Sequence, residues 1–194
     1  PFSEQNQCVI VAKLKFMAPL VFDIETKDTF FEVGENDPAK LSISVVGIYD
    51  YATNTLKAFQ EHEFKDMWPY FEKADALVGY NSDHFDIPLL NKYYPGDITK
   101  IKSIDLMKTI QESLGRRIKL QDVASATLGV SKSGQGLDAI TWWKNGEVEK
   151  IIEYCLKDVT ITRDLFDYMK NNKKVLIPNG GVGHEVNLNI DSWL

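Results

Sequence analysis

Residues 20–26, LVFDIET, place two carboxylates inside a segment that otherwise has the composition of a buried strand. Side chains two positions apart on a strand point to the same face, so Asp23 and Glu25 share one face while Phe22 and Ile24 lie on the other. Two carboxylates held side by side in an apolar setting repel each other and lose hydration, which is unfavourable without compensation. We therefore expect a bound cation at this strand, with an ion pair to lysine as the alternative.

The composition limits the classes of protein to which the chain can belong. Its 194 residues suit one domain with a sizeable core. The formal net charge of −6 argues against binding of nucleic acid through a strongly basic surface, but it leaves binding through a metal open. Cys8 and Cys155 are the only cysteines, so we expect no disulfide framework and a cytoplasmic location. We find no apolar run long enough to span a membrane and no signal-peptide pattern.

Predicted strands and helices alternate along the chain, with a hairpin through the turn YATN. We expect strands at residues 19–26, 41–50, 55–59, 76–81, 174–178 and 184–194, and helices at residues 63–74, 86–94, 105–115, 120–129, 137–144 and 147–171. This order predicts an α/β fold with a mixed sheet flanked by helices. Residues 1–18 are expected to form an N-terminal arm or an extra strand.

The last long helix carries a third acid on its apolar side. At about 100° per residue, Asp158 falls within the arc that also holds Cys155, Leu165 and Met169. Tyr154 lies four residues earlier, one turn away on the same side. A carboxylate on the buried face of a helix is unusual, so Asp158 joins the two strand acids as an inward-pointing carboxylate.

Residues 79–90, GYNSDHFDIPLL, contain a fourth acid where a strand ends and a helix begins. Asp86 either joins the other carboxylates or only stabilises the N-terminal end of the helix. Asp105, in SIDLM, is expected to cap the next helix, with a supporting role behind a metal site as the alternative.

The stretches DIET, GYNSDHFDIPLL and YCLKDVTITRDLF resemble, in this order and spacing, the three exonuclease motifs of the DEDD superfamily. The resemblance runs from about residue 19 to residue 169. The chain resembles most the proofreading domains of family-B DNA polymerases and their free-standing or helicase-linked YprB-type relatives. It implies that residues 19–194 form a ribonuclease H-like exonuclease domain, with an α/β mixed sheet flanked by helices.

Carried over position by position, the resemblance implies that Asp23 and Glu25 are first-motif metal ligands, Asp86 the second-motif ligand and Asp158 the third. Tyr154 matches the tyrosine of the Tyr-x-x-x-Asp subclass. Two Mg²⁺ or Mn²⁺ ions on such carboxylates stabilise charge, activate water and assist the leaving oxygen in phosphodiester hydrolysis. We expect Asp23 to bridge both ions, Glu25 and Asp158 to hold the ion near the water, and Asp86 the other ion. Tyr154 is expected to orient the water.

The resemblance also implies what the protein acts on. We expect a metal-dependent 3′–5′ exonuclease that hydrolyses single-stranded DNA, with RNA or a structured end as alternative substrates. A different class of protein is also possible, namely a non-catalytic nucleic-acid-binding module derived from this fold. A helicase or a polymerase is the candidate protein partner.

Contacts to the strand are expected close to the motifs. Tyr80 and Phe85 are predicted to stack on a base or to wedge between the last two bases. Asn81 either fixes the turn or contacts the terminal nucleotide. The loop SKSGQG, residues 131–136, is a candidate to close over the substrate. Six basic residues either bind phosphates or form a solvated surface: Lys92, Lys100, Lys102, Arg116, Arg117 and Lys119.

Overall fold

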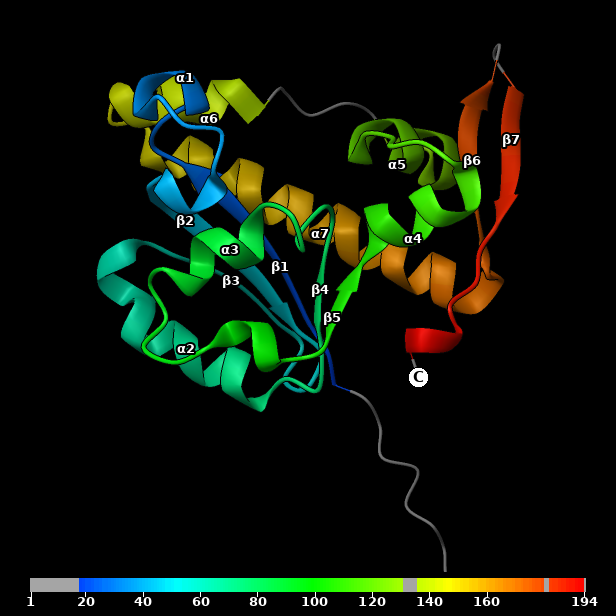
Figure 1. Cartoon of the computed structure of the whole chain (residues 1–194), viewed down its shortest axis with the longest axis horizontal. Coiled ribbons are helices and arrows are strands. Elements are labelled where there is room, and N and C mark those ends of the chain that lie inside the picture. The colour runs from blue at the N-terminus through cyan, green and yellow to red at the C-terminus, as the bar shows by residue number, and fades with distance from the viewer. Residues whose placement is uncertain (1–17, 131–135, 180–181, 194) are drawn as a thin grey trace, which may run out of the picture.

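The computed structural model describes residues 18–130, 136–179 and 182–193 (Figure 1). The strands are β1 (Leu20–Thr26), β2 (Ile43–Asp50), β3 (Thr55–Phe59), β4 (Leu77–Gly79), β5 (Ser103–Asp105), β6 (Lys174–Asn179) and β7 (Val182–Asn187). The first five form one mixed sheet in the order β3-β2-β1-β4-β5, and β6 pairs with β7 in a separate hairpin. The predicted mixed sheet is therefore confirmed.

The helices lie around this sheet and extend to the terminal hairpin. They are α1 (Phe30–Val33), α2 (Phe64–Lys73), α3 (Asp86–Asn91), α4 (Leu106–Leu114), α5 (Leu120–Leu128), α6 (Gly136–Lys144) and α7 (Val148–Asn172). The long helix α7 packs on β1, β2, β3 and β4, and α6 packs on α7. Figure 1 shows α7 crossing the sheet, with α2 and α3 on the opposite side and α5 beside β6.

The central strand β1 shows the alternation expected from its sequence. It is antiparallel to β2 and parallel to β4, so both of its edges are paired. Val21 packs in one apolar cluster with residues of α7, whereas Phe22 packs in another with residues of α2 and α3. Because side chains alternate along a strand, Asp23 and Glu25 emerge on the α7 side.

A glycine allows α7 to lie close to the sheet. Gly47 of β2 is the strand partner of Asp23 in the β1–β2 register. A Cβ atom at this position would lie 2.9 Å from both the Sγ atom of Cys155 and the Cγ2 atom of Val159 on α7. Only a residue without a side chain fits beneath the helix at this spacing.

Local differences from the sequence prediction concern short elements and the terminal strand, which was predicted over residues 184–194 but covers Val182–Asn187 and is followed by a 3-10 turn at Asp191–Trp193. The strand β5 was not expected, because three residues are too few to show a period of two, and the helix predicted from residue 105 begins at Leu106. The four-residue helix α1, held by a capping box from Thr29, was also missed. The predicted arm, residues 1–18, lies outside the described residues except for Ala18. The loop 131–136 also lies outside the described residues, except for Gly136.

None of the helices in the described ranges combines the length and apolar character needed to cross a membrane.

Candidate metal centre and cleft

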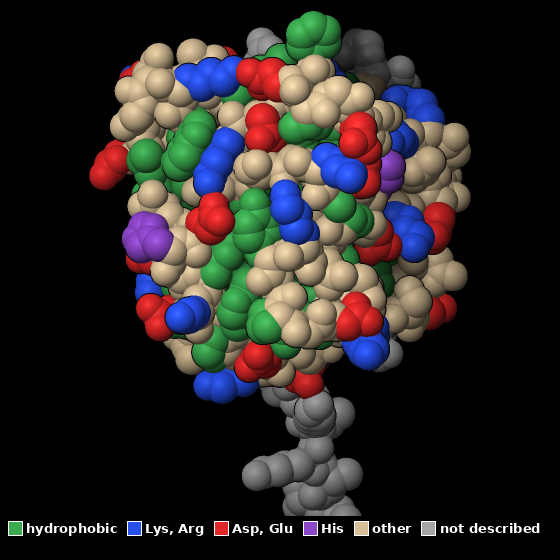
Figure 2. Space-filling view, turned by 60° about the vertical axis from the view of Figure 1, so that its left-hand side comes forward, with side chains coloured by type: hydrophobic (Ala, Val, Ile, Leu, Met, Phe, Trp, Pro, Cys, Tyr) green, Lys and Arg blue, Asp and Glu red, His purple; other side chains and the backbone are tan. Residues whose placement is uncertain are grey.

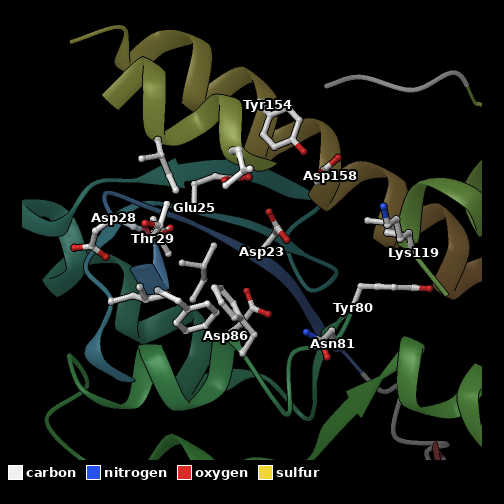
Figure 3. Close-up of a pocket in the computed structure, with 18 of the residues that line it drawn as sticks. Asp23, Glu25, Asp28, Thr29, Tyr80, Asn81, Asp86, Lys119, Tyr154 and Asp158 are labelled. Carbon is white, nitrogen blue, oxygen red and sulfur yellow. Dashed lines mark hydrogen bonds between the residues drawn. The ribbon is translucent and has the colours of Figure 1, made fainter. Parts of the chain in front are cut away.

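Three of the predicted metal ligands meet between β1 and α7. Asp23 and Glu25 come from one face of β1, and Asp158 comes from the helix that covers this face. One carboxylate oxygen from each of the three residues lies within 4.8 Å of those from the other two. Glu25 is buried, while the other two are partly exposed towards the cleft. Figure 3 shows the three side chains pointing into the same space.

Mutual repulsion and burial make this cluster costly without a cation. Burial, followed by the charges of Glu25, Asp158 and Asp86, raises the pKa of Asp23 well above its ordinary value. Burial and the charges of Asp158 and Asp86 do the same to the pKa of Glu25. Burial also raises the pKa of Asp158, although a hydrogen bond from the Tyr154 hydroxyl opposes this rise. Such shifts are the expected signature of carboxylates gathered at a functional site.

The fourth acid faces the cluster from the other side of the cleft. Asp86 is the first residue of α3 and is 6% exposed. Burial raises the pKa of its carboxyl to about 7, despite backbone hydrogen bonds from Ile24 and from Asp86 itself. It lines the same cleft as Asp23 but lies outside the group of three acids within 4.8 Å (Figure 3).

Tyr154 is placed where its hydroxyl can act on the same space. It lies one helical turn before Asp158, and its hydroxyl points toward the Asp158 carboxylate (Figure 3). Its ring packs edge-on against Trp142 of α6, with 5.9 Å between ring centroids. Burial and the charges of Asp158, Glu25 and Asp23 raise the pKa of Tyr154 above its ordinary value. An ordinary tyrosine hydroxyl is already protonated at neutral pH and is a hydrogen-bond donor.

The acids line one cleft of about 760 Å³. Its walls come from β1, α1, α3, α5, α6 and α7, and include the apolar residues Phe30, Leu41, Leu120, Leu137 and Ile140. Five carboxylates line it, from Asp23, Glu25, Asp28, Asp86 and Asp158, and Lys119 is the only cationic residue among the described lining residues. The cleft is therefore strongly acidic with one positive side chain at its wall.

The residues predicted to contact substrate all line this cleft, in different ways. Phe85 packs edge-on against Phe30, with 6.0 Å between ring centroids, and so forms part of the apolar wall. The Tyr80 hydroxyl donates to the backbone oxygen of Ile118 at 2.8 Å, which ties its ring to the wall behind the cleft. Asn81 adopts a left-handed backbone conformation, with φ of 65°, and its side-chain oxygen accepts a hydrogen bond from Arg117.

The residues fit a divalent metal centre. Hard carboxylate oxygens are the ligands that Mg²⁺ and Mn²⁺ prefer, and three of them converge here with a fourth nearby. Among the described residues, the ion pairs include none of these four acids, so the lysine pair left open by the sequence is not formed. A cation that binds these oxygens relieves their repulsion.

Sequence reasoning missed one residue of the cleft and did not single out another. Asp28 lines the cleft and accepts a hydrogen bond from the Ser42 backbone at 2.9 Å, and only its position just after the first motif hinted at this. Lys119 was grouped with five other basic residues, and no sequence signal separated it from them. The cap predicted for Asp105 is confirmed, since its carboxylate accepts from the backbone of Lys108 at 3.2 Å.

The structure is an α/β fold with a cluster of carboxylates suited to a divalent metal. A model of the RNase H superfamily matches residues 20–170, so the chain belongs to this superfamily. Superfamily membership and the acidic cluster indicate nuclease activity that depends on a divalent metal.

A solved structure shows the same fold within a longer protein. The family B DNA polymerase from the hyperthermophilic archaeon Pyrobaculum calidifontis is similar, with a TM-score of 0.60 and 21% sequence identity. The similar region covers 79% of this chain and 24% of the polymerase chain, so this chain spans about a quarter of that protein. No curated protein matches the sequence.

Proposed function

We propose that the protein is a metal-dependent 3′–5′ exonuclease that removes nucleotides from single-stranded DNA. The observation that carries this proposal is the convergence of Asp23, Glu25, Asp86 and Asp158, together with Tyr154, in one cleft. The same five residues match the motifs of the DEDD exonucleases in order and spacing. The similarity in fold to a family B DNA polymerase supports DNA as the substrate class.

The four acids would hold two Mg²⁺ or Mn²⁺ ions, with Asp23 between Glu25 and Asp158 on one side and Asp86 on the other. When bound, such ions neutralise charge on the phosphate and lower the pKa of water. The protein supplies the ligand positions from a central strand and the helix packed on it, which are rigid elements.

Tyr154 would orient the attacking water rather than remove its proton. A free tyrosine hydroxyl titrates near pH 10, so at neutral pH it forms hydrogen bonds instead of acting as a general base. The hydroxyl points toward the Asp158 carboxylate, one helical turn away (Figure 3).

The acidic cleft can accept the phosphates of a strand once cations neutralise its carboxylates, and two residues of its wall offer contacts to that strand. Phe85, packed against Phe30, offers an aromatic surface for a base, and Lys119, the only cationic residue among the described lining residues, offers a positive charge for a phosphate. On the face shown in Figure 2, acidic and basic side chains are interspersed and do not gather by sign. We therefore place strand binding in the cleft.

A helicase or polymerase partner and a cytoplasmic location belong to the same proposal.

The test is digestion of single-stranded DNA and RNA labelled at the 5′ end, with Mn²⁺ or with chelator. We expect the labelled strands to be shortened from the 3′ end in the presence of Mn²⁺ but not in chelator. We expect DNA to be shortened faster than RNA. The Asp158→Ala variant is the matched negative control, because it removes one predicted ligand at a position of α7 that is only partly buried. Faster shortening of RNA than of DNA would show that RNA is the preferred substrate. Strand binding without cleavage would replace the proposal with a binding module.

A further inference from the structure

The loop that leads to Asp86 is held by the strand next to it. The strands β4 and β5 are parallel neighbours, and Gly79 at the end of β4 pairs with Asp105 at the end of β5. The chain leaves β4 through residues 80–85 and enters α3 at Asp86. Because both strands end at the same edge of the sheet, the side chain of Asp105 lies beside this loop.

Asp105 binds the loop through its carboxylate. One oxygen, Oδ1, accepts from the backbone N–H groups of Asn81 at 2.9 Å and Lys108 at 3.2 Å. The other oxygen, Oδ2, accepts from the backbone N–H group of Asp83 at 3.1 Å. The residue is 5% exposed. Capping of α4 requires only the bond from Lys108. The bonds from Asn81 and Asp83 therefore serve another purpose than capping.

The loop passes this restraint on to Asp86. The backbone N–H of Phe85 donates to the backbone carbonyl oxygen of Asn81 at 3.1 Å. The backbone N–H of Ile87 donates to the backbone carbonyl oxygen of Ser82 at 2.9 Å. These bonds connect the loop to the first turn of α3 on both sides of Asp86. Asn81 is held in a left-handed conformation that a non-glycine residue rarely adopts without support.

A second acid in the loop strengthens the connection to β5. The Asp83 carboxylate accepts from the Ser103 hydroxyl at 2.6 Å and from the Lys108 ammonium at 3.1 Å. Strand β5, helix α4 and the loop therefore form one hydrogen-bonded unit, with Asp105 at its buried centre.

We propose that Asp105 is a positioning residue that fixes the 80–85 loop so that Asp86 faces the acids of β1 and α7. The role rests on the proposed function, since it concerns the fourth ligand of that centre. Groups behind a metal ligand are commonly needed to hold it in place, and their loss typically costs roughly 10–100-fold in metal affinity or activity.

The substitution Asp105→Ser separates positioning from capping. Serine is a good N-cap and can keep the bond to the Lys108 amide, but its single short hydroxyl cannot also reach Asn81 and Asp83. We expect amide hydrogen exchange, followed by NMR without metal, to become faster at Asn81 and Asp83 and to stay slow along α4. The matched control is Asp97→Ser, because Asp97 also caps a short helical turn, by accepting from Thr99 at 3.2 Å.

Metal binding and turnover give a second readout. We expect Asp105→Ser to weaken Mn²⁺ binding, and kcat on single-stranded DNA to fall, by roughly 10–100-fold each, with little change in KM. Asp97→Ser is expected to leave both unchanged. If Asp105→Ser does not fold, Asp105→Asn serves instead, since its amide nitrogen cannot accept from the Asp83 N–H.

The outcomes separate this role from the proposed function. Unchanged exchange at Asn81 and Asp83, or faster exchange with unchanged Mn²⁺ affinity, overturns the positioning role whether or not the protein cleaves DNA. Absence of cleavage by the parent protein overturns the proposed function, while exchange and Mn²⁺ affinity still decide the role of Asp105.

Discussion

Substitution of Gly47 by alanine should move α7 away from the metal centre. The new Cβ would lie 2.9 Å from the Sγ atom of Cys155 and the Cγ2 atom of Val159, whereas ordinary contacts begin at 3.4 Å, so these side chains or the helix that carries them have to shift by about 0.5 Å. Overpacking of this kind typically costs about 1–3 kcal/mol of stability. Because α7 carries Asp158 and Tyr154, and a misplacement of about 1 Å can cost 10²-fold in rate, we expect a loss of about tenfold in kcat.

The assay compares Gly47→Ala with the parent protein in thermal unfolding and in cleavage of single-stranded DNA at saturating Mn²⁺. A loss of 1–3 kcal/mol corresponds to a decrease in Tm of roughly 2–12 °C for a domain of this size. Gly183→Ala is the matched control, because it also adds a Cβ to a strand but meets only an ordinary 3.4 Å contact with Leu176. Equal Tm and kcat for Gly47→Ala and the parent would refute the close-packing argument.

Three further predictions concern the acids and Tyr154. Tyr154→Phe should lower kcat by roughly 10²–10³, as for one hydrogen bond made in the transition state, without weakening Mn²⁺ binding; an unchanged kcat would return the hydroxyl to a packing role. Millimolar Mn²⁺ should raise Tm, because it binds the folded site better than the unfolded chain, and Asp23→Ala should abolish this rise; a rise that persists in the variant places the ion elsewhere. In chelator, stability should fall between about pH 4, where an unfolded Asp titrates, and about pH 7, because burial raises the folded-state pKa of Asp86 to about 7 and in this range the folded protein holds a proton that the unfolded chain releases. Denaturant titrations across this range, with Asp86→Asn as control, measure that slope, and a slope that is flat or identical in the control would contradict it.

The metal-ligand candidates were predictable because each one breaks a local pattern. Asp23 and Glu25 interrupt a buried strand, and Asp158 lies on the apolar arc of a long helix. A buried carboxylate is costly enough that its presence alone indicates compensation. The long, strongly periodic helix α7 and the hairpin of β2 and β3 were predictable for the same reason, since their patterns extend over many residues.

The features that could not be predicted depend on contacts between distant segments. Gly47 has a special role only because α7 crosses β2 at that residue, more than 100 positions later in the chain. The bonds from Asp105 to the loop depend on the parallel pairing of β4 with the three-residue strand β5, which is too short to leave a periodic signal. Tyr80 was predicted to stack on a base, but nothing in its sequence context indicated that its hydroxyl binds Ile118.

The most direct test of the metal centre is a crystal grown with Mn²⁺ and a short single-stranded DNA, examined by anomalous diffraction. The four-acid arrangement predicts anomalous peaks in the cleft, bounded by Asp23, Glu25 and Asp158 on one side and by Asp86 on the other, with the 3′ end of the strand beside them. Peaks elsewhere on the surface, or a cleft without an anomalous signal at saturating Mn²⁺, would contradict it.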